Sequence, residues 1–424
     1  MSEKQDISEN YLRTKTLIGY IPRKAASAEV YADLGFKCGL EIHQQLLTDK
    51  KLFCRCPAGV YHDKADFDAE VIRHMRPTLS ELGEYDGTAL MEFKTKKNIV
   101  YRLKNETACT YEIDDTPPFP IDRQALDIAI RIALMLKTNI VGELHITRKQ
   151  YLDGSIPTGF QRTAIVGIEG EIPLTGKTVR IIQLSIEEDS CREVSDIGHW
   201  RVYATDRLGM PLIEMVTYPD MTTPDEAAEA GQYLRFLARS SGLVRTGIGA
   251  AREDVNVSIT GGTRVEIKGV AHIAWIPELT HNEAFRQKAL LQIASRLQKS
   301  GSGDGWKPAV QAFPARLLGG FYSAMSAFSN DGHRLVAVNL PGFAGSLSFF
   351  TQPGKVFADE ISGRLKVVAC LEQPNMLASE HIREELILSE QDASEIRRLL
   401  HATRDDAQIV LWGPSEDIDT AVET

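Results

Sequence analysis

The sequence predicts an α+β protein, on the strength of three observations. From Leu34 onward, short apolar runs of strand length alternate with Gly, Pro and Asp turns. Helical patterns are few and are scattered among the strands instead of alternating with them, as they would in a doubly wound sheet. A Gly/Ser-rich stretch near residue 300 separates a long first part from a shorter second part.

The first part contains seven segments that we interpret as strands. They are KCGLEIHQQL, KNIVYRL, ELHITRKQYL, VRIIQLSIEED, MPLIEMV, DVNVSI and RVEIKGV. Helices are predicted over about 122–137, from Pro224 and over about 282–297. The second helix has the clearest start, because Thr223 can cap it and Glu226 completes a Thr-x-x-Glu capping box.

These elements predict four regions. Residues 1–33 form a polar N-terminal arm, 34–298 the main domain, 299–306 a flexible linker and 307–424 a smaller α/β domain. In the smaller domain HRLVAVNL, LKVVACL and AQIVLW are expected as strands, and Ser389–His401 as a capped helix. The last ten residues, SEDIDTAVET, resemble the opening of a helix.

Composition excludes several classes of protein. The 424 residues carry a formal charge of −10, whereas a general nucleic-acid binder has a basic balance. No run approaches the roughly 18 apolar residues of a membrane-spanning helix. The N-terminus carries acids and lacks the apolar core of a secretory signal. A cytoplasmic protein without a membrane partner is expected.

The six cysteines are too few and too irregularly spaced for a disulfide framework. Cys54 and Cys56 are close enough to form half of a zinc site. No second cysteine pair completes four ligands, so zinc is not expected and buried free thiols are the simpler interpretation.

Several acidic residues are candidate ligands for a divalent cation. Glu41 and His43 are two residues apart on a predicted strand and therefore share one face. Glu187 and Glu188 follow an apolar run, and Glu214 interrupts a strand that should be buried, where a charge needs a partner. Carboxylates suit Mg²⁺, and the histidine leaves Mn²⁺ open. A surface-facing polar pair and a solvated acidic turn are the alternatives.

Two glycine-bearing segments are candidate phosphate-binding loops. The first runs from Asp153 to Arg162, is flanked by Arg148 and Lys149, and lacks the P-loop pattern, so a surface turn is its alternative. The second runs from Arg245 to Asp254, has two glycines between Arg245 and Arg252, and leads into an alternating strand, Val255–Ser258, that bears Asn256. On the next strand Arg264, Glu266 and Lys268 share a face, which is either solvated or the floor of a cleft. No Gly-x-Ser-x-Gly elbow or other nucleophile system is present.

Six stretches together resemble the B/E family of tRNA-dependent amidotransferase subunits. They are GLEIHQQLLTDKKLFCRCP, DGSIPTGFQRTAIVG, EEDS, DRLGMPLIEMVTYPD, RTGIGAAREDVNVSI and RVEIKGV. TYEIDDTPPFPI, RVEIKGVAHIAWIPEL and the absence of a second cysteine pair favour the E branch, found in the archaeal-type glutamyl-tRNA(Gln) amidotransferase. VAVNLPGFAGSL resembles a domain inserted in that branch and in bacterial aspartyl-tRNA synthetases.

The resemblance implies a cradle-like mixed-sheet domain that is a carbon–nitrogen ligase. In that family ATP phosphorylates the γ-carboxylate of glutamate on Glu-tRNA(Gln), and Mg²⁺ would offset charge on the transferring phosphoryl group. Ammonia from a separate asparaginase-like partner, the D-type polypeptide of the complex, then gives Gln-tRNA(Gln), so a hetero-oligomer is expected. By motif, the family's metal positions fall on Glu41, His43, Glu188 and Glu214, with Glu187 as an adjacent candidate. The segments that line the same cradle hold Asp153, Gly154, Ser155, Gly159, Arg162, Arg252, Asp254, Asn256, Glu266 and Lys268.

The chain departs from the family pattern in two places. The family continues into a helical domain and a tail that grip tRNA, and this sequence stops at Thr424 before either. Ser-Ile-Pro-Thr before Gly159 also differs from the usual archaeal segment. Two alternatives follow: a shortened relative that amidates another carboxylate, or a non-catalytic scaffold that binds tRNA. Four candidate metal ligands argue against the scaffold.

Overall fold

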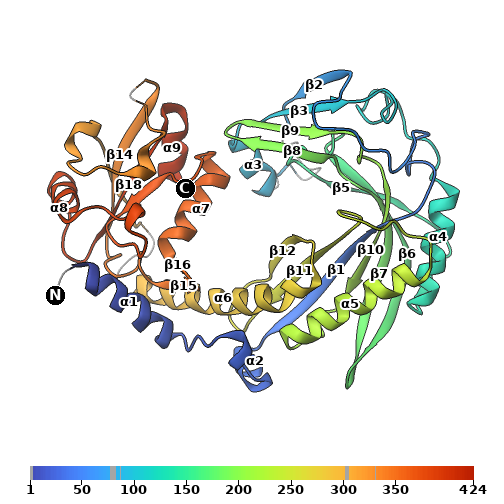
Figure 1. The fold of residues 1–424 in the computed structure, drawn as a ribbon, viewed down its shortest axis with the longest axis horizontal. Helices are drawn as coiled ribbons and strands as arrows, with labels where there is room; N and C mark the ends of the chain where they lie inside the picture. The colour runs from blue at the N-terminus through green and yellow to red at the C-terminus, as the bar shows by residue number, and fades with distance from the viewer. Residues whose placement is uncertain (1–2, 77–82, 86, 301–304, 330) are drawn as a thin grey trace. The chain divides into compact units, whose positions relative to one another are not determined.

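The computed structural model describes residues 3–76, 83–85, 87–300, 305–329 and 331–424 (Figure 1). The chain forms two compact units: a large unit of residues 23–284, and a small unit of residues 1–22 and 285–424. Most strand pairs are antiparallel, and helices do not alternate regularly with strands. The predicted α+β class is therefore confirmed.

An eight-stranded antiparallel sheet is the centre of the large unit. Seven strands follow the order β12-β11-β1-β10-β7-β6-β4, and β5 pairs with β6 off this path. Their bounds are β1 Lys37–Gln45, β4 Asn139–Ile140, β5 Ile146–Gln150, β6 Phe160–Leu174, β7 Lys177–Glu188, β10 Pro211–Thr217, β11 Ala251–Ser258 and β12 Val265–Val270. Segments far apart in the sequence, such as β1 and β10, thus lie side by side.

Two helices, α4 (Arg123–Met135) and α5 (Pro224–Ser240), pack against one face of this sheet and against each other (Figure 1). Successive strand residues point to opposite faces. On β1, Leu40 and Ile42 are fully buried, and Leu40 approaches α5 at Gly231. The alternate residues of β1 therefore lie on the face that the helices leave open.

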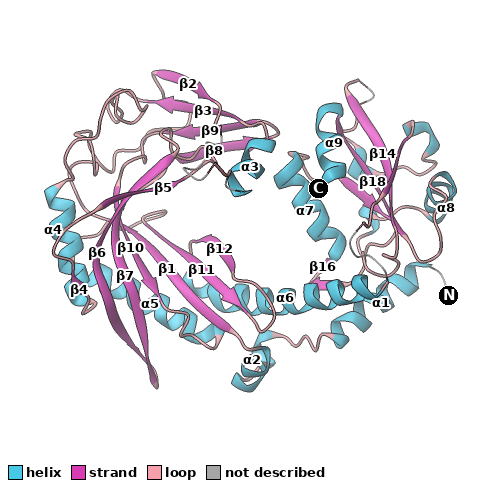
Figure 2. Cartoon of the chain, turned by 180° about the vertical axis from the view of Figure 1, so that it is seen from behind, coloured by secondary structure: helices cyan, strands magenta, loops and turns pink. Residues whose placement is uncertain are grey.

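A second sheet of the large unit has the order β2-β3-β9-β8, in which β3 and β9 run parallel. Figure 2 shows it as a layer separate from the eight-stranded sheet. Its bounds are β2 Ala69–Arg73, β3 Asn98–Leu103, β8 Arg192–Ile197 and β9 Trp200–Ala204, with α3 Gly87–Lys94 before β3. Its core includes Tyr101 and Tyr203, whose rings stack at 6.1 Å.

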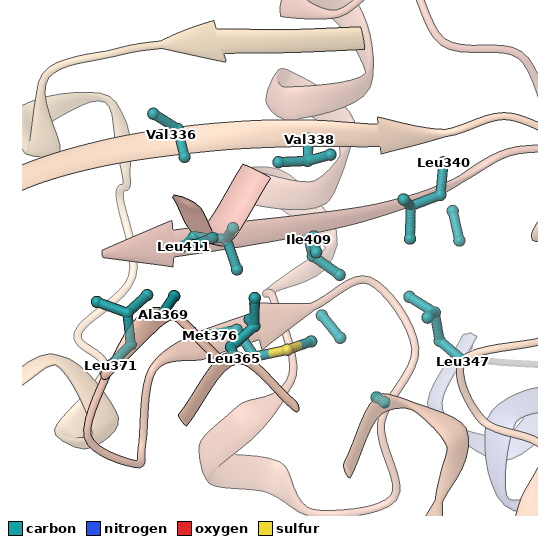
Figure 3. Close-up of a cluster of buried hydrophobic side chains, with 14 of the residues drawn as sticks. Val336, Val338, Leu340, Leu347, Leu365, Ala369, Leu371, Met376, Ile409 and Leu411 are labelled. Atoms are coloured by element: carbon teal, nitrogen blue, oxygen red, sulfur yellow. The ribbon is translucent and has the colours of Figure 1, made fainter. Parts of the chain in front are cut away.

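The small unit is built on the sheet β13-β14-β18-β17. Successive side chains along β14 enter two separate cores, Val336, Val338 and Leu340 on one face (Figure 3) and Leu335 and Ala337 on the other. Element bounds are β13 Ala309–Ala312, β14 His333–Leu340, β15 Phe350–Gln352, β16 Lys355–Val356, α7 Phe357–Ala369, β17 Met376–Ala378, α8 Glu390–Leu399, β18 Ala407–Pro414 and α9 Ser415–Glu423.

The remaining elements are helices and short 3₁₀ turns. Helix α6 spans Ile276–Lys299, so it begins six residues before the predicted start, and the division between the compact units falls within it. The other bounds are α1 Glu3–Leu17, α2 Ala28–Leu34, η1 Arg23–Ala25, η2 Ile273–Trp275, η3 Ala315–Leu317, η4 Ser323–Met325 and η5 Glu384–Leu386.

Two segments differ from their prediction. Residues 1–33 were expected to form a polar arm, but α1 packs on the small unit: Thr14 accepts a bond from the Phe350 amide at 3.0 Å, and Ile18 is buried. LKVVACL was expected as a strand and instead forms the end of α7. Leu365, Val368 and Ala369 are buried there at helical spacing, a pattern that a short apolar run cannot distinguish from a strand.

Two further sequence predictions are resolved only in part. The predicted linker at 299–306 includes 301–304, which lie outside the described residues, so it remains a prediction. The capped start of α5 is present, since the Thr223 hydroxyl accepts from the Glu226 amide at 3.2 Å. The reciprocal bond goes one residue further back, from the Thr222 amide to the Glu226 carboxylate at 2.7 Å.

A helix that crosses a membrane has to be both long and apolar, which sets two requirements for the helices of the described ranges. None of them meets both requirements.

The end of α4 packs so closely against β6 that Gly170 leaves no room for a side chain. A Cβ on Gly170 would lie 2.5 Å from the carbonyl oxygen of Leu136, which is backbone and cannot swing away. We expect Gly170→Ala to destabilise the large unit by about 1–3 kcal/mol, as overpacking does, and to lower its melting temperature in calorimetry. Gly142→Ala is the matched control, since nothing lies within 4 Å of its Cβ position. Equal melting temperatures for both variants would contradict this packing.

Candidate functional site

The open face of the eight-stranded sheet brings together an imidazole and two carboxylates from three neighbouring strands. His43 on β1 lies directly opposite Glu214 on β10, and Glu187 comes from β7, the next strand. The His43 Nε2 atom is 3.4 Å from a carboxylate oxygen of each glutamate. We call His43, Glu187 and Glu214 the central cluster. One potential ligand atom from each lies within 4.8 Å of the others.

Lys149 completes the central cluster from the edge of the sheet. It lies on β5 and reaches across β6, so that its Nζ is 3.0 Å from Glu187 Oε2 and 2.9 Å from Glu214 Oε2. In the sequence, Lys149 stood out only as a flank of the glycine-bearing loop. Its position on a short strand of alternating residues was a signal, but the sequence did not reveal that β5 pairs with β6.

The central cluster is buried and strongly charged. Glu187 is 1% exposed and Glu214 5%, so each carboxylate requires a partner. Burial alone would raise the pKa of Glu214, but the bond from His43 and the charge of Lys149 outweigh it and lower the pKa to about 2. Burial likewise acts to lower the pKa of His43, whereas hydrogen bonds to both glutamates raise it to about 10. The imidazole is therefore held as a cation.

A second acidic group lies beside the central cluster on β1, β11 and β12. Carboxylate oxygens of Glu41, Asp254 and Glu266 lie within 4.8 Å of one another. Asn256 donates to Glu41 at 3.0 Å, and the ammonium of Lys268 is 3.2 Å from Glu266. Burial raises the pKa of Glu41. Glu41 and His43 share a face as expected, but they belong to adjacent groups.

Glu188 is not part of the central cluster. As the next residue after Glu187 on β7 it takes a different direction, because side chains alternate along a strand. Its carboxylate accepts from the Tyr111 hydroxyl and from the Arg162 amide, the latter at 3.1 Å. Burial is the largest influence on Glu188 and raises its pKa. The structure thus places Glu187, not Glu188, with His43 and Glu214.

Arginine side chains near the site are held by acidic partners. Arg252 donates to both carboxylate oxygens of Asp189, at 2.8 and 3.3 Å, and Gln45 donates to the same group at 2.8 Å. Burial opposes the charge of Asp189, but Arg252 prevails and the pKa of Asp189 is lowered. Arg162 lies over the Tyr111 ring at 5.1 Å. Asp189 was not among the predicted site residues.

The predicted phosphate loop packs partly against the second sheet. Gly154 has φ +81°, and a Cβ there would lie 2.7 Å from Ile99. Its carbonyl accepts from the Tyr101 hydroxyl at 2.6 Å. Asp153 accepts from the amide and hydroxyl of Ser155, and the Gly159 amide donates to Ile156. Much of the loop's polar capacity is therefore used internally.

A third constellation, which we call the thiol cluster, consists of Cys54, Cys56, Cys109 and Glu112. One ligand atom of each lies within 4.8 Å of the others. The Glu112 carboxylate also lies 3.2 Å from the ammonium of Lys51, and both side chains are fully buried. The Cys109-x-x-Glu112 spacing was missed in the sequence, because only a second cysteine pair was considered. Two further potential ligands do join Cys54 and Cys56 in the folded chain.

The two carboxylates around His43 generate a testable titration. Because the folded-state pKa of about 10 exceeds the ordinary 6.5, the stability contributed by the imidazolium is fully present below pH 6.5 and is lost as pH rises through 10. In the metal-free protein, we expect the His43 ring to stay protonated to about pH 9. Its ring nitrogen resonances, assigned by their loss in His43→Gln, report this in nuclear magnetic resonance spectra. Glu214→Gln should lower the midpoint of the His43 titration, because it removes one of the two carboxylates that raise the pKa of the ring. A wild-type midpoint near 6.5 would contradict the geometry.

Known proteins resemble this chain over most of its length. The model of the GatB/GatE catalytic domain matches residues 36–334. The E-type chain of glutamyl-tRNA(Gln) amidotransferase from Methanocaldococcus jannaschii is 36% identical over 398 residues, or 93% of this chain and 61% of that protein. Its counterpart in Sulfurisphaera tokodaii is 37% identical, with 93% and 62% covered. That of Aeropyrum pernix is 40% identical over 334 residues, with 78% and 52% covered.

The chain thus spans 52–62% of the length of these three relatives. The family match extends through both sheets of the large unit and through every residue of the central cluster, the second acidic group and the thiol cluster. The resemblance inferred from the sequence motifs is confirmed. This chain belongs to the family of GatB/GatE catalytic domains.

Proposed function

We propose that this chain activates glutamate carried by Glu-tRNA(Gln), as part of an ATP-dependent conversion to Gln-tRNA(Gln). A carboxylate is a poor electrophile, because its negative charge repels a nucleophile and its oxygen leaves poorly. Transfer of the γ-phosphoryl group of ATP to the γ-carboxylate gives ADP and a γ-glutamyl phosphate. Ammonia then forms the C–N bond while phosphate departs, which yields the amide.

The observation that carries this proposal is the central cluster on the open face. Its two buried carboxylates and one imidazole are a donor set that fits Mg²⁺ or Mn²⁺, and none of the three is a thiol or hydroxyl nucleophile that would suggest acyl-enzyme chemistry instead. When bound, such an ion offsets charge on a transferring phosphoryl group. Glu187, Glu214 and His43 would hold it. Glu41, Asp254 and Glu266 supply a neighbouring acidic group for a second ion or for positioning.

The cationic residues around these clusters would orient the anionic reactants. Lys268 lies between Glu266 and Asp254, with 66% of its side chain exposed. Arg252 is already held in place by Asp189, so its side chain would lose little conformational entropy when an anionic reactant binds to it. The names of the relatives support tRNA as the substrate carrier.

Ammonia is proposed to come from another polypeptide. The sequence holds no recognisable nucleophile system for releasing it, and an asparaginase-like partner is the proposed source, so the working enzyme would be a hetero-oligomer. We propose that it works in the cytoplasm. We also propose that residues 307–424 correspond to the inserted domain shared with bacterial aspartyl-tRNA synthetases.

ATP hydrolysis by the purified chain tests the function directly. With Mg²⁺ present, we expect ADP release to depend on Glu-tRNA(Gln), because the carboxylate is the phosphoryl acceptor. Glu214→Ala should reduce that rate by about 10²-fold or more, comparable to the loss of one strong electrostatic contact to a transition state. Circular dichroism of each variant is the check that it is folded.

Glu229→Gln is a matched control, because Glu229 accepts surface bonds from Thr175 on the large unit, away from the clusters. Its rate should equal that of the wild type. Unchanged activity in Glu214→Ala would refute the metal assignment. A folded wild type that is not stimulated by Glu-tRNA(Gln) but is stimulated by another carboxylate would favour the shortened relative with a different substrate. Binding of tRNA without hydrolysis would favour the scaffold.

Zinc is not expected from the sequence, but because folding brings Cys109 and Glu112 to Cys54 and Cys56, we further propose that the thiol cluster binds a structural zinc ion. Three thiolates and a carboxylate are ligands that Zn²⁺ takes in proteins. Burial is the largest influence on the Cys109 thiol and raises its pKa to about 12, so a thiolate there needs a compensating cation. The buried ammonium of Lys51 supplies one positive charge against four anionic ligands, and a divalent ion would offset most of the rest.

Metal analysis by mass spectrometry checks this proposal. We expect about one zinc per chain in protein purified without chelator, and a loss of zinc together with a lower melting temperature in Cys109→Ala. Cys191→Ala is the control, since Cys191 is a buried thiol in the core of the second sheet. Zinc-free wild-type protein with an unchanged melting temperature after zinc addition would refute the site.

A further inference from the structure

We propose that Lys149 serves as the resident cation of the central cluster, and that a divalent ion binds there by exchanging with the Lys149 ammonium. The inference rests on the metal site of the proposed function. Its starting point is the nearly equal distances from Nζ to the two glutamates, 3.0 Å to Glu187 and 2.9 Å to Glu214. A single ammonium thus lies where an ion that bridges both carboxylates would lie.

The oxygen atoms of the two carboxylates are divided between two cations. On each glutamate, Oε1 faces His43 and Oε2 faces Lys149. An ion that takes an oxygen from each carboxylate must therefore displace one of the two. His43 can lose a proton and become a ligand itself, because a neutral imidazole has a lone pair. An ammonium has three donors and no acceptor, so Lys149 has to withdraw.

The strand positions show which partner is able to move. Glu187 and Glu214 lie on β7 and β10, inside the eight-stranded sheet, with side chains 1% and 7% exposed. Lys149 lies on β5, which pairs with β6 off the main strand order, and 38% of its side chain is exposed. A lysine head group on four methylene groups changes rotamer readily. The carboxylates are thus fixed, and the ammonium can swing out toward solvent.

Charge explains why the exchange would be useful. Two carboxylates this close repel each other unless a cation lies between them. Lys149 provides one positive charge in the metal-free protein, and a divalent ion provides two when it replaces the ammonium. The freed ammonium stays tethered at the edge of the same site, where it can contact an anionic phosphate of the substrate. Lys149 would then have a role in both states: in the metal-free protein it neutralises the two carboxylates, and with the ion bound it contacts the phosphate.

Binding of Mn²⁺, measured by electron paramagnetic resonance of the free ion, tests the exchange without any turnover. We expect Lys149→Met to bind Mn²⁺ about tenfold more tightly than the wild type, which is about 1.4 kcal/mol, because no ammonium has to leave. Lys149→Arg keeps the charge and should not bind more tightly than the wild type. Lys177→Met is the matched control and should bind Mn²⁺ like the wild type, since Lys177 pairs with Glu226 of α5 at 2.8 Å and with neither acidic group.

A second measurement uses the wild type and so does not depend on the folding of a variant. The reactivity of each lysine toward an amine-specific reagent is followed by mass spectrometry, with and without Mg²⁺. We expect Mg²⁺ to increase labelling of Lys149, whose ammonium loses its two carboxylate partners, more than labelling of Lys355 in the small unit.

The outcomes separate the two levels of the argument. Tighter Mn²⁺ binding in Lys149→Met, or Mg²⁺-dependent labelling of Lys149, supports the exchange. Wild-type binding of Mn²⁺ with no gain in Lys149→Met and no change in labelling overturns the exchange and leaves the proposed function intact. A wild type that binds neither ion overturns the metal site of the proposed function, and the exchange with it.

Discussion

Two carboxylates buried side by side, Glu187 and Glu214, are the feature on which the site depends. Their ligand atoms lie within 4.8 Å of each other, so both carboxylates stay ionised only when cations lie beside them; otherwise one of them takes up a proton. The chain supplies those cations from opposite directions, His43 from the neighbouring strand and Lys149 from β5. The stability of the sheet centre and the proposed capacity to receive a metal ion therefore have the same electrostatic origin, because the cluster needs positive charge in either state.

The helical side of the sheet makes this arrangement possible. Leu40 and Ile42 are buried on the face that α5 covers. Because side chains alternate along a strand, Glu41 and His43 point to the opposite face. Antiparallel pairing then sets His43 against Glu214 and Glu41 against Asp254. An apolar core thus fixes a polar site one residue away, and a slip of one residue in β1 would exchange the two faces.

Features that are encoded locally could be predicted from the sequence. The shared face of Glu41 and His43 follows from strand periodicity, and the start of α5 follows from Thr223 and Pro224. The strand predicted at LKVVACL failed because a short apolar run fits both periods.

Contacts over long separations were not accessible in the same way. Lys149 joins the cluster because β5 folds against β6, and Cys109 and Glu112 reach Cys54 from 55 and 58 residues away. The choice between Glu187 and its neighbour also needed the direction of β7 at its last residues, which the pairing with β6 and β10 defines.

Strands β14, β17 and β18 of the small unit have apolar side chains on both faces, so the sheet they form lies between two cores. Val338 and Ala337 are neighbours in sequence, yet they share no core. A larger side chain in one core cannot fill a cavity left by a smaller side chain in the other core, because the backbone of the sheet lies between them. The sheet therefore acts as a partition between two separately packed interiors.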